Sequence, residues 1–288
     1  MRWVGRRQSE NVEDRRGMSR GGVMATGGGL AGLAVLLLSY FLGVDVSGLL
    51  PQGGPETGGG PVTERAANPA EEQLKAFTTT VLADTEDVWN ELFRSQARRE
   101  YPEPTLVLFS EGVRSACGSA SSATGPFYCP SDQKVYLDMS FFEELARRFR
   151  AAGDFAQAYV IAHEVGHHVQ NQFGVLNDVH SQRGRVSEAE FNRLSVRLEL
   201  QADFLAGVWA HHAQRTKDIL EPGDIEEALN AAQAIGDDRL QKQAQGYVVP
   251  DAFTHGTSAQ RVRWFKLGFE SGDLSRMMET FRVNYNSL

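Results

Sequence analysis

The stretch FAQAYVIAHEVGHHVQNQ occupies residues 155–172 of this 288-residue chain. Its apolar run at residues 159–161 supplies the buried flank expected of a helix. At 3.6 residues per turn, His163 and His167 lie one turn apart on the same face of that helix, where they can hold one zinc ion. Glu164 is rotated round that face toward the open coordination position, so it can take a proton from metal-bound water. The stretch therefore predicts a hydrolytic metal site on one helix.

A third ligand is expected from a second helix. The metzincin arrangement is excluded, because Gln170 and Phe173 stand where that class carries glycine and histidine. In the helix that begins after Ser187, Glu199 and Asp203 lie at positions i and i+4, so their carboxylates share one face. Glu199 can complete a site of two histidines and one carboxylate, and Asp203 can accept the free ring N–H of a zinc histidine. The alternative is a solvated helix face, but the surrounding residues are apolar nearly all round.

From residue 68 onward the pattern predicts an α+β domain that is mainly helical. A helix is expected over residues 68–93, with Asn68 as its N-cap. The runs 105–109 and 134–138 favour β-strands, and with the segment 125–130 between them they predict a small sheet. Further helices are expected over residues 140–152, 155–172, 187–215, 223–245, 258–270 and 273–285.

The N-terminal part differs in composition from the rest. Residues 1–20 carry six arginines against three acids, and no charged residue follows until Asp45. This uncharged run is long enough to cross a bilayer, and arginines before it place the N-terminus in the cytoplasm. A buried soluble helix or a cleaved signal peptide is the alternative. The expected order is a basic cytoplasmic head over residues 1–22, a transmembrane helix over 23–44, a Gly/Pro-rich linker over 45–67 and the domain with the metal site over 68–288.

The net charge and the cysteine content indicate which kinds of partner and which cellular compartment to expect. The formal net charge is −8 and the isoelectric point is about 5.4, so the chain lacks the basic surface that nucleic-acid binding requires. The two cysteines, Cys117 and Cys129, flank a loop rich in Ser, Ala and Gly. In an oxidising compartment they predict one disulfide, and two unrelated buried thiols are the alternative.

Peptide hydrolysis also needs a donor for the oxyanion, and His255 is the candidate. It lies in a loop just before the helix that Ser258 is expected to cap. Loops on a rigid scaffold often carry such groups. The alternative is a loop histidine that caps or packs locally.

Several motifs make the chain resemble a known family. HEVGHHVQ at 163–170 with ELQAD at 199–203 resembles the gluzincin metallopeptidases, whose E-x-x-A-D motif supplies the third ligand. More closely, the whole chain is similar to the YpfJ-like family of neutral zinc metallopeptidases. That family is also matched by MRW at 1–3, NVEDRRG at 11–17, GPFYCP at 125–130 and HGTSAQR at 255–261. The resemblance implies a zincin-like domain with one zinc ion, in a single-pass bacterial peptidase outside the cytoplasm. The spacing of His255 and Arg261 resembles a His and Arg pair of HtpX-class gluzincins.

Together these observations predict a membrane-anchored zinc metallopeptidase that hydrolyses peptide bonds of proteins or peptides outside the cytoplasm. His163, His167 and Glu199 are the expected ligands, and Glu164 is the expected general base. The alternative is a catalytically silent, zinc-stabilised binding or chaperone-like module of the cell envelope, although structural zinc sites usually have four protein ligands. Two histidines and one carboxylate also suit non-haem iron, but Glu164 beside the first histidine favours hydrolysis.

Overall fold

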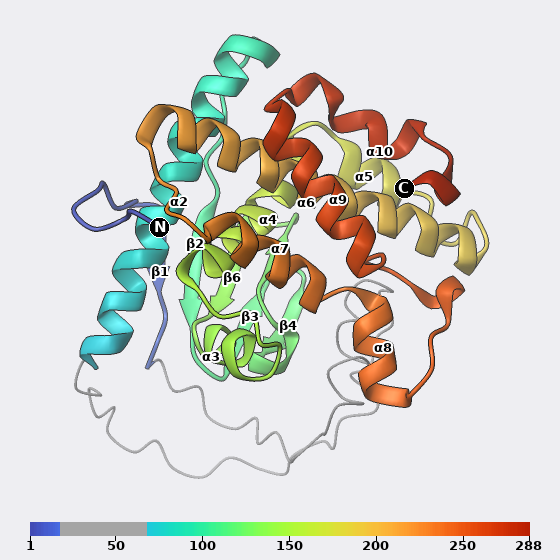
Figure 1. The fold of residues 1–288 in the computed structure, drawn as a ribbon, viewed down its shortest axis with the longest axis horizontal. Helices are drawn as coiled ribbons and strands as arrows, with labels where there is room; N and C mark the ends of the chain where they lie inside the picture. Colours follow the sequence, from blue (N-terminus) through green and yellow to red (C-terminus); the bar gives the residue numbers. More distant parts are fainter. Residues whose placement is uncertain (18–67) are drawn as a thin grey trace.

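The computed structural model describes residues 1–17 and 68–288, which form an α+β domain that is mainly helical (Figure 1). The strands are β1 Val12–Asp14, β2 Thr105–Phe109, β3 Gly112–Ser115, β4 Gly118–Ser121, β5 Phe127–Cys129 and β6 Lys134–Asp138. The α-helices are α2 Pro69–Leu92, α3 Ser140–Arg147, α4 Asp154–Gln172, α5 Val175–His180, α6 Glu188–Lys217, α7 Asp224–Ala234, α8 Asp237–Gln245, α9 Ser258–Ser271 and α10 Glu279–Arg282. Shorter helical turns are η2 Phe93–Ala97, η3 Ser122–Thr124, η4 Pro250–Ala252, η5 Leu274–Met278 and η6 Tyr285–Ser287.

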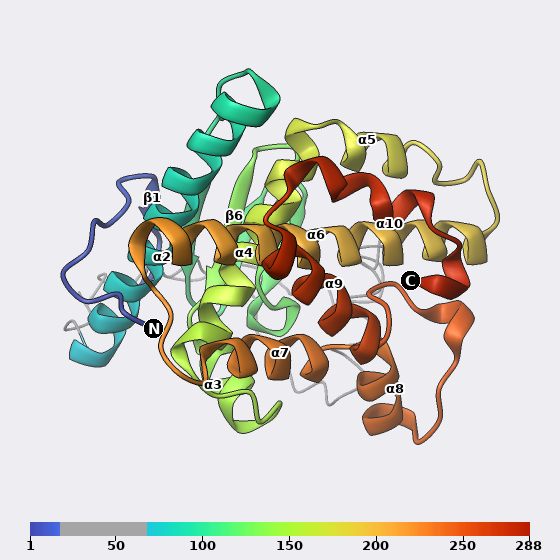
Figure 2. The ribbon, with the colours of Figure 1, turned by 45° about the horizontal axis from the view of Figure 1, so that its top comes forward.

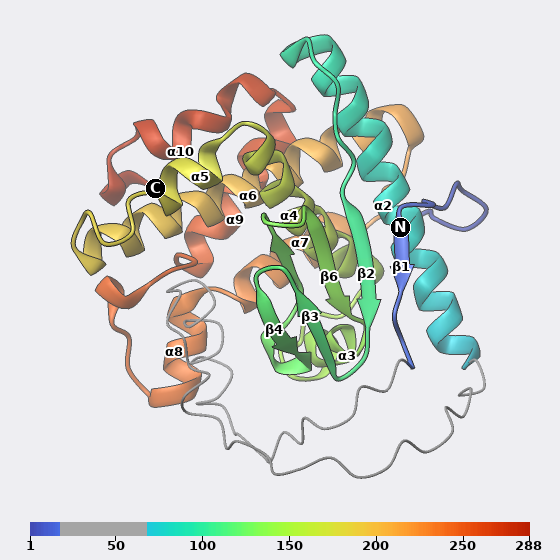
Figure 3. The same cartoon turned by 180° about the vertical axis from the view of Figure 1, so that it is seen from behind.

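The four-stranded sheet is mixed and has the order β1-β2-β6-β5. β1, β2 and β6 run parallel, whereas β5 pairs with β6 in the antiparallel sense. Because side chains alternate along a strand, Leu106 and Leu108 point into the main core with the helices. Val107 and Phe109 instead pack in a second cluster with Val113 of the β3–β4 hairpin. Figure 3 shows the hairpin in front of the sheet and the helices behind it, so both faces are covered.

A disulfide fixes the hairpin to the sheet. Cys117, in the turn between β3 and β4, is bonded to Cys129 of β5, and the two Cα atoms are 5.8 Å apart. The expected pairing is therefore the one in the structure. It joins the turn of the hairpin to the strand at the edge of the four-stranded sheet.

Three packed helices, α4, α6 and α9, form the centre of the helical layer (Figure 2). Glycines set how closely they approach. A Cβ at Gly207 of α6 would lie 2.1 Å from the carbonyl oxygen of Phe265, and one at Gly268 of α9 would lie 2.0 Å from that of Phe204. On α4, a Cβ at Gly166 would come within 3.0 Å of the carbonyl oxygen of Ala202. The close contact at Gly166 brings the HEVGH turn of α4 against the ELQAD segment of α6.

Most expected helices and strands are confirmed, and the expected helices that are divided or capped differently lie in the C-terminal half. Asn68 caps α2, and the capping box of Ser187 and Glu190 starts α6. The helix expected over 223–245 is broken into α7 and α8 at Gly236, whose backbone is extended with φ −70° and ψ 143°. A Cβ at Gly236 would lie 2.4 Å from the backbone nitrogen of Ser258, so only glycine fits there. Thr257, not Ser258, is the N-cap of α9. The helix expected over 273–285 is instead the series η5, α10 and η6.

The sequence predicts a separate basic head over residues 1–22. In the structure, residues 1–17 instead belong to the domain. β1 lies in the same sheet as β2 and β6, with Val12, Glu13 and Asp14 in register with Leu106, Val107 and Leu108. Because β1 and β2 are far apart in the sequence, their pairing leaves no local sequence signal. The arginines alone therefore favoured a separate head. Among residues 1–17 and 68–288, none of the helices has the length and apolar character to cross a membrane. The helix expected over 23–44 and the linker over 45–67 fall outside the described residues.

Candidate metal centre

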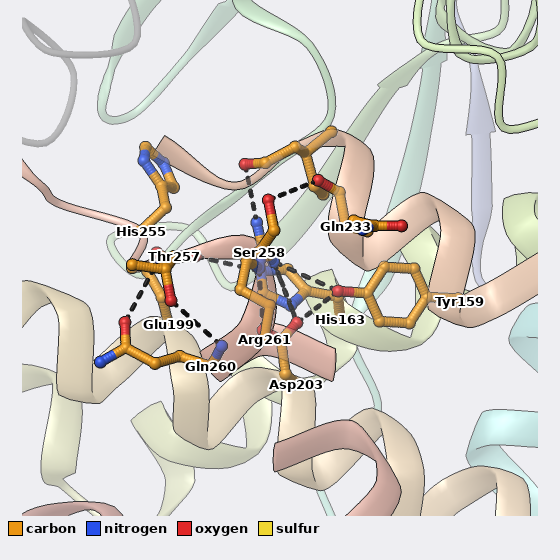
Figure 4. A network of polar contacts seen from close by, with 12 residues as sticks. Tyr159, His163, Glu199, Asp203, Gln233, His255, Thr257, Ser258, Gln260 and Arg261 are labelled. Atoms are coloured by element: carbon orange, nitrogen blue, oxygen red, sulfur yellow. Dashed lines mark hydrogen bonds and ion pairs between the residues drawn. The ribbon is translucent and has the colours of Figure 1, made fainter. Parts of the chain in front are cut away.

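The three expected metal ligands meet in one buried group. Nε2 of His163 lies 3.2 Å from Oε2 of Glu199, and Nε2 of His167 lies 3.5 Å from Oε1 of the same carboxylate. The side chains come from α4 and α6, and one ligand atom from each lies within 4.8 Å of the others. Relative exposure is only 6%, 6% and 2% for His163, His167 and Glu199. Figure 4 shows Glu199, His163 and their neighbours.

The outer nitrogens of both histidines are fixed by acceptors. Nδ1 of His163 lies 2.9 Å from Oδ1 of Asp203, and Nδ1 of His167 lies 2.8 Å from Oε1 of Gln170. A carboxylate and an amide oxygen can only accept, so each Nδ1 carries the proton and donates it. When the rings are neutral, as metal binding requires, the lone pair of each lies on Nε2, on the side of Glu199. This is the tautomer that metal binding through Nε2 requires.

The donor set fits a divalent cation. Oε1 of Glu199 is buried and has no hydrogen-bond partner among the described residues, which is costly unless an ion satisfies it. Two imidazoles and one carboxylate suit zinc, and three protein ligands leave a coordination position for water or substrate. His163, His167 and Glu199 would hold the ion.

Asp203 is the hub of a buried network behind His163. Its Oδ2 accepts from Nε of Arg261 at 2.8 Å, and its Oδ1 accepts from Nη2 of Arg261 at 2.9 Å and from the hydroxyl of Tyr159. Asp203 is fully buried and Arg261 is 2% exposed. Burial opposes ionisation of Asp203, but Arg261 and His163 outweigh it and lower the pKa of this carboxyl. Asp203 is therefore a carboxylate that orients His163.

Hydrogen bonds at the start of α9 position Arg261 in that network. Thr257 donates its backbone N–H to Oε1 of Gln260 at 2.8 Å, while the backbone N–H of Gln260 donates to the Thr257 hydroxyl. The hydroxyl of Ser258 donates to the carbonyl oxygen of Gln233 on α7 at 2.8 Å. Figure 4 shows these contacts beside Arg261. The first turn of α9 is thus fixed on α7.

Gln170 connects the two ligand helices. Besides accepting from His167, its amide nitrogen donates to the carbonyl oxygen of Leu198 at 2.6 Å, and the side chain is fully buried. Leu198 precedes Glu199 on α6. One amide therefore orients a histidine ligand and holds the backbone beside the carboxylate ligand.

The electrostatics of the group favour a bound cation. Burial alone would lower the pKa of His163, but Asp203 and Glu199 outweigh it and raise that pKa to about 9. Although burial opposes ionisation of Glu199, His167 and His163 keep the pKa of its carboxyl below the usual range. Burial raises the pKa of Glu164, and the neighbouring histidines offset this only in part. Glu164 is thus a carboxyl with more than ordinary proton affinity beside the ligands.

His255 lies in the loop between α8 and α9, where Asp237 holds it. Oδ2 of Asp237 accepts the backbone N–H groups of Thr254, His255 and Gly256 at 2.7, 2.6 and 3.0 Å. Oδ1 of Asp237 lies 3.2 Å from Nδ1 of His255. Burial lowers the pKa of His255, but Asp237 and Glu199 outweigh it and raise the pKa above its ordinary value. The ring is therefore biased toward the protonated form.

Sequence reasoning missed Asp237 because the expected helix over 223–245 placed it in a helix interior. In the structure Asp237 is the first residue of α8, after Gly236. A Gly-Asp-Asp start is a helix-initiation signal that would have singled it out. His168 is the other residue clarified by the structure. Its Nε2 lies 2.6 Å from the carbonyl oxygen of Pro102 and its Nδ1 lies 3.0 Å from the hydroxyl of Tyr128, so it joins α4 to the sheet side.

A second group of acids, Asp154, Asp224 and Glu227, also has metal-ligand spacing. The α-ammonium group of Met1 lies 2.6 Å from Oδ1 of Asp154 and 3.4 Å from Asp224. A cation of the chain itself therefore lies against two of these three carboxylates.

Comparison with known proteins agrees with the geometry. A family model described as "Putative neutral zinc metallopeptidase" matches residues 1–281. The Escherichia coli K12 protein named "Uncharacterized protein YpfJ" is 50% identical over 285 residues, which cover 95% of this chain and 96% of that protein. The Mycobacterium tuberculosis H37Rv protein named "Uncharacterized protein Rv2575" is 48% identical over 183 residues, covering 60% of this chain and 61% of that protein. No solved structure matches the chain.

Proposed function

The chain belongs to the neutral zinc metallopeptidase family, and on that basis we propose that it is a zinc-dependent peptidase that hydrolyses peptide bonds in proteins or peptides. The observation that carries the proposal is the buried group of His163, His167 and Glu199, with an unsatisfied oxygen on Glu199. Glu164 follows the first ligand directly and has a raised pKa. Ligands and base together suit metal-assisted amide hydrolysis.

A zinc ion held by His163, His167 and Glu199 would supply Lewis acidity toward water and the scissile carbonyl. Glu164 accepts a proton from the attacking water at a carboxylate oxygen and later gives it to the leaving amide nitrogen. Its raised pKa suits both steps, since the carboxyl must hold the proton between them. His255, whose pKa Asp237 raises, donates a hydrogen bond to the carbonyl oxygen as negative charge develops there.

We further propose that the domain acts outside the cytoplasm and associates with a membrane through residues 23–44. The disulfide between Cys117 and Cys129 supports an oxidising compartment. The uncharged, apolar run supports contact with a membrane, although it lies outside the described residues.

The test is cleavage of a mixed pool of unstructured peptides by the purified full-length protein, followed by mass spectrometry. Glu164→Gln keeps the shape of the side chain but removes the base, so this variant should bind zinc normally and cleave nothing. Glu143→Gln, on an exposed residue of α3, is the matched control and should cleave like the wild type. Cleavage by Glu164→Gln would refute the role of the base. A folded, zinc-loaded wild type that cleaves no peptide would instead support a zinc-stabilised binding module.

A further inference from the structure

The arginines that precede the uncharged run are engaged by the folded domain. Five of them lie in the described residues, and each pairs with a carboxylate: Arg2 with Asp218, Arg6 with Asp84, Arg7 with Glu86 and Asp87, Arg15 with Glu13, and Arg16 with Asp14 and Glu72. Three of these arginines thus reach acids on α2, and one reaches the end of α6. These charges are part of the tertiary structure of the domain.

Residues 68–288 in turn depend on contacts with residues 1–17. Glu86 of α2 is 1% exposed, and its partners are Ser9, Asn11 and Arg7, all from the N-terminal segment. A buried carboxylate that loses its partners is strongly destabilising. Trp3 packs edge-on against Phe77 of α2 with ring centroids 5.5 Å apart.

Backbone hydrogen bonds complete the attachment. Leu106 of β2 donates to the carbonyl oxygen of Asn11 at 2.9 Å, and Arg15 donates to that of Leu108 at 2.8 Å. Such bonds cannot form across a hydrocarbon core about 30 Å thick. Figure 3 shows β1 between β2 and α2, inside the same body.

We infer that residues 1–17 and residues 68–288 lie on the same side of any membrane with which the chain associates. A membrane cannot separate the two ranges, because β1 pairs with β2 in one sheet. This replaces the expected arrangement of a cytoplasmic N-terminus and an outer domain. The positive-inside rule does not decide the topology here, because arginines that are paired within a domain are no longer free to act as a signal on the opposite side.

The inference is tested by cysteine labelling of the full-length protein in intact cells and in sealed inverted membrane vesicles. Val4→Cys reports on the N-terminal segment and Tyr247→Cys on the body, since these side chains are 82% and 62% exposed. The wild type is the control, because its two cysteines are bonded to each other. A membrane-impermeant maleimide should label both variants in the same preparation. Labelling of one in cells and of the other in vesicles would overturn the inference.

A second measurement checks the attachment itself. The amide of Asn11 donates to Oε2 of Glu103 at 2.6 Å, so Asn11→Cys with Glu103→Cys places two thiols within reach of a short bis-maleimide. After treatment of the membranes with this reagent, proteolytic peptides should show the two segments linked. Val4→Cys with Tyr247→Cys is the control pair and should remain unlinked. Equal linkage in both pairs, or none in either, would contradict the arrangement.

Discussion

The guanidinium group of Arg261 on α9 contacts both carboxylate oxygens of Asp203 on α6, with Nε to Oδ2 at 2.8 Å and Nη2 to Oδ1 at 2.9 Å. Oδ1 of the same carboxylate lies 2.9 Å from Nδ1 of His163. A planar, two-point contact of this kind fixes the carboxylate in orientation as well as in position. The geometry of one metal ligand therefore depends on a helix that contributes no ligand.

Arg261→Met should weaken both zinc binding and the fold. Asp203 would remain as a buried charge without its arginine, which costs about 3 to 5 kcal/mol of stability. Loss of the partner that orients a metal ligand lowers metal affinity about 10- to 100-fold. Chelator competition and denaturant unfolding measure the two effects. Arg263→Met, on an exposed residue of α9, is the control and should change neither. Unchanged zinc affinity in Arg261→Met would refute the coupling.

Glu199→Gln should lose far more zinc than Asp203→Asn. Glutamine keeps the size of the side chain but removes the charged ligand atom, so we expect the purified variant to contain almost no zinc. Asparagine at position 203 leaves the three ligands in place but removes the charge that orients His163 and pairs with Arg261, which reduces affinity about 10- to 100-fold. Metal analysis after dialysis against a weak chelator checks this. Equal zinc content in the wild type and Glu199→Gln would remove Glu199 from the ligand set.

Gln170→Leu should release the ring of His167. Without the amide oxygen 2.8 Å away, Nδ1 has no fixed acceptor and the proton can move to Nε2, where it blocks metal binding. We expect about 10-fold weaker zinc binding. In the zinc-free protein, nitrogen-15 NMR should show His167 as a mixture of tautomers. The control is Gln172→Leu on the same helix, whose amide contacts Gln133. A single Nδ1–H tautomer in Gln170→Leu would contradict the role.

The ligand helices could be predicted from the sequence because their signals are local. The spacing of His163 and His167, and the capping box that starts α6, each lie within a few residues. β1 could not be predicted, since its pairing with β2 joins residues 12–14 to 106–108 and leaves no periodic trace. The break at Gly236 also escaped prediction, because it depends on the distant backbone of Ser258. Local patterns therefore located the ligands, whereas tertiary contacts decided the loop that carries His255.

Asp237→Asn should change the pH dependence of peptide cleavage. The Asp237 carboxylate raises the pKa of His255, and the proposed oxyanion donor is the protonated ring. Activity is then lost as the pH rises through that pKa. Removing the charge lowers the pKa, so the alkaline limb of kcat/KM should move to lower pH. The asparagine can still accept backbone N–H groups, which protects the loop. If the alkaline limb stays at the same pH, His255 is not the donor to the oxyanion.

His168 should make the fold sensitive to acid. The ring is fully buried, and burial lowers its pKa from 6.5 to about 4, although the carbonyl oxygen of Pro102 opposes the shift. Between pH 6.5 and 4 the unfolded chain therefore binds more protons than the folded one, so the free energy of unfolding falls as the pH falls. The loss due to this residue should reach about 3 kcal/mol at pH 4.

Denaturant unfolding of the zinc-free protein between pH 4 and 7 measures this dependence without a contribution from metal release. His168→Gln has no titrating group at this position, so its stability should fall less steeply than that of the wild type over the same range. Glutamine can still donate to the carbonyl oxygen of Pro102, which limits the change at pH 7. His211→Gln is the control, because that ring contacts the carbonyl oxygen of Phe269 at the far end of α6. Identical slopes in the wild type and His168→Gln would show that this histidine is not held neutral.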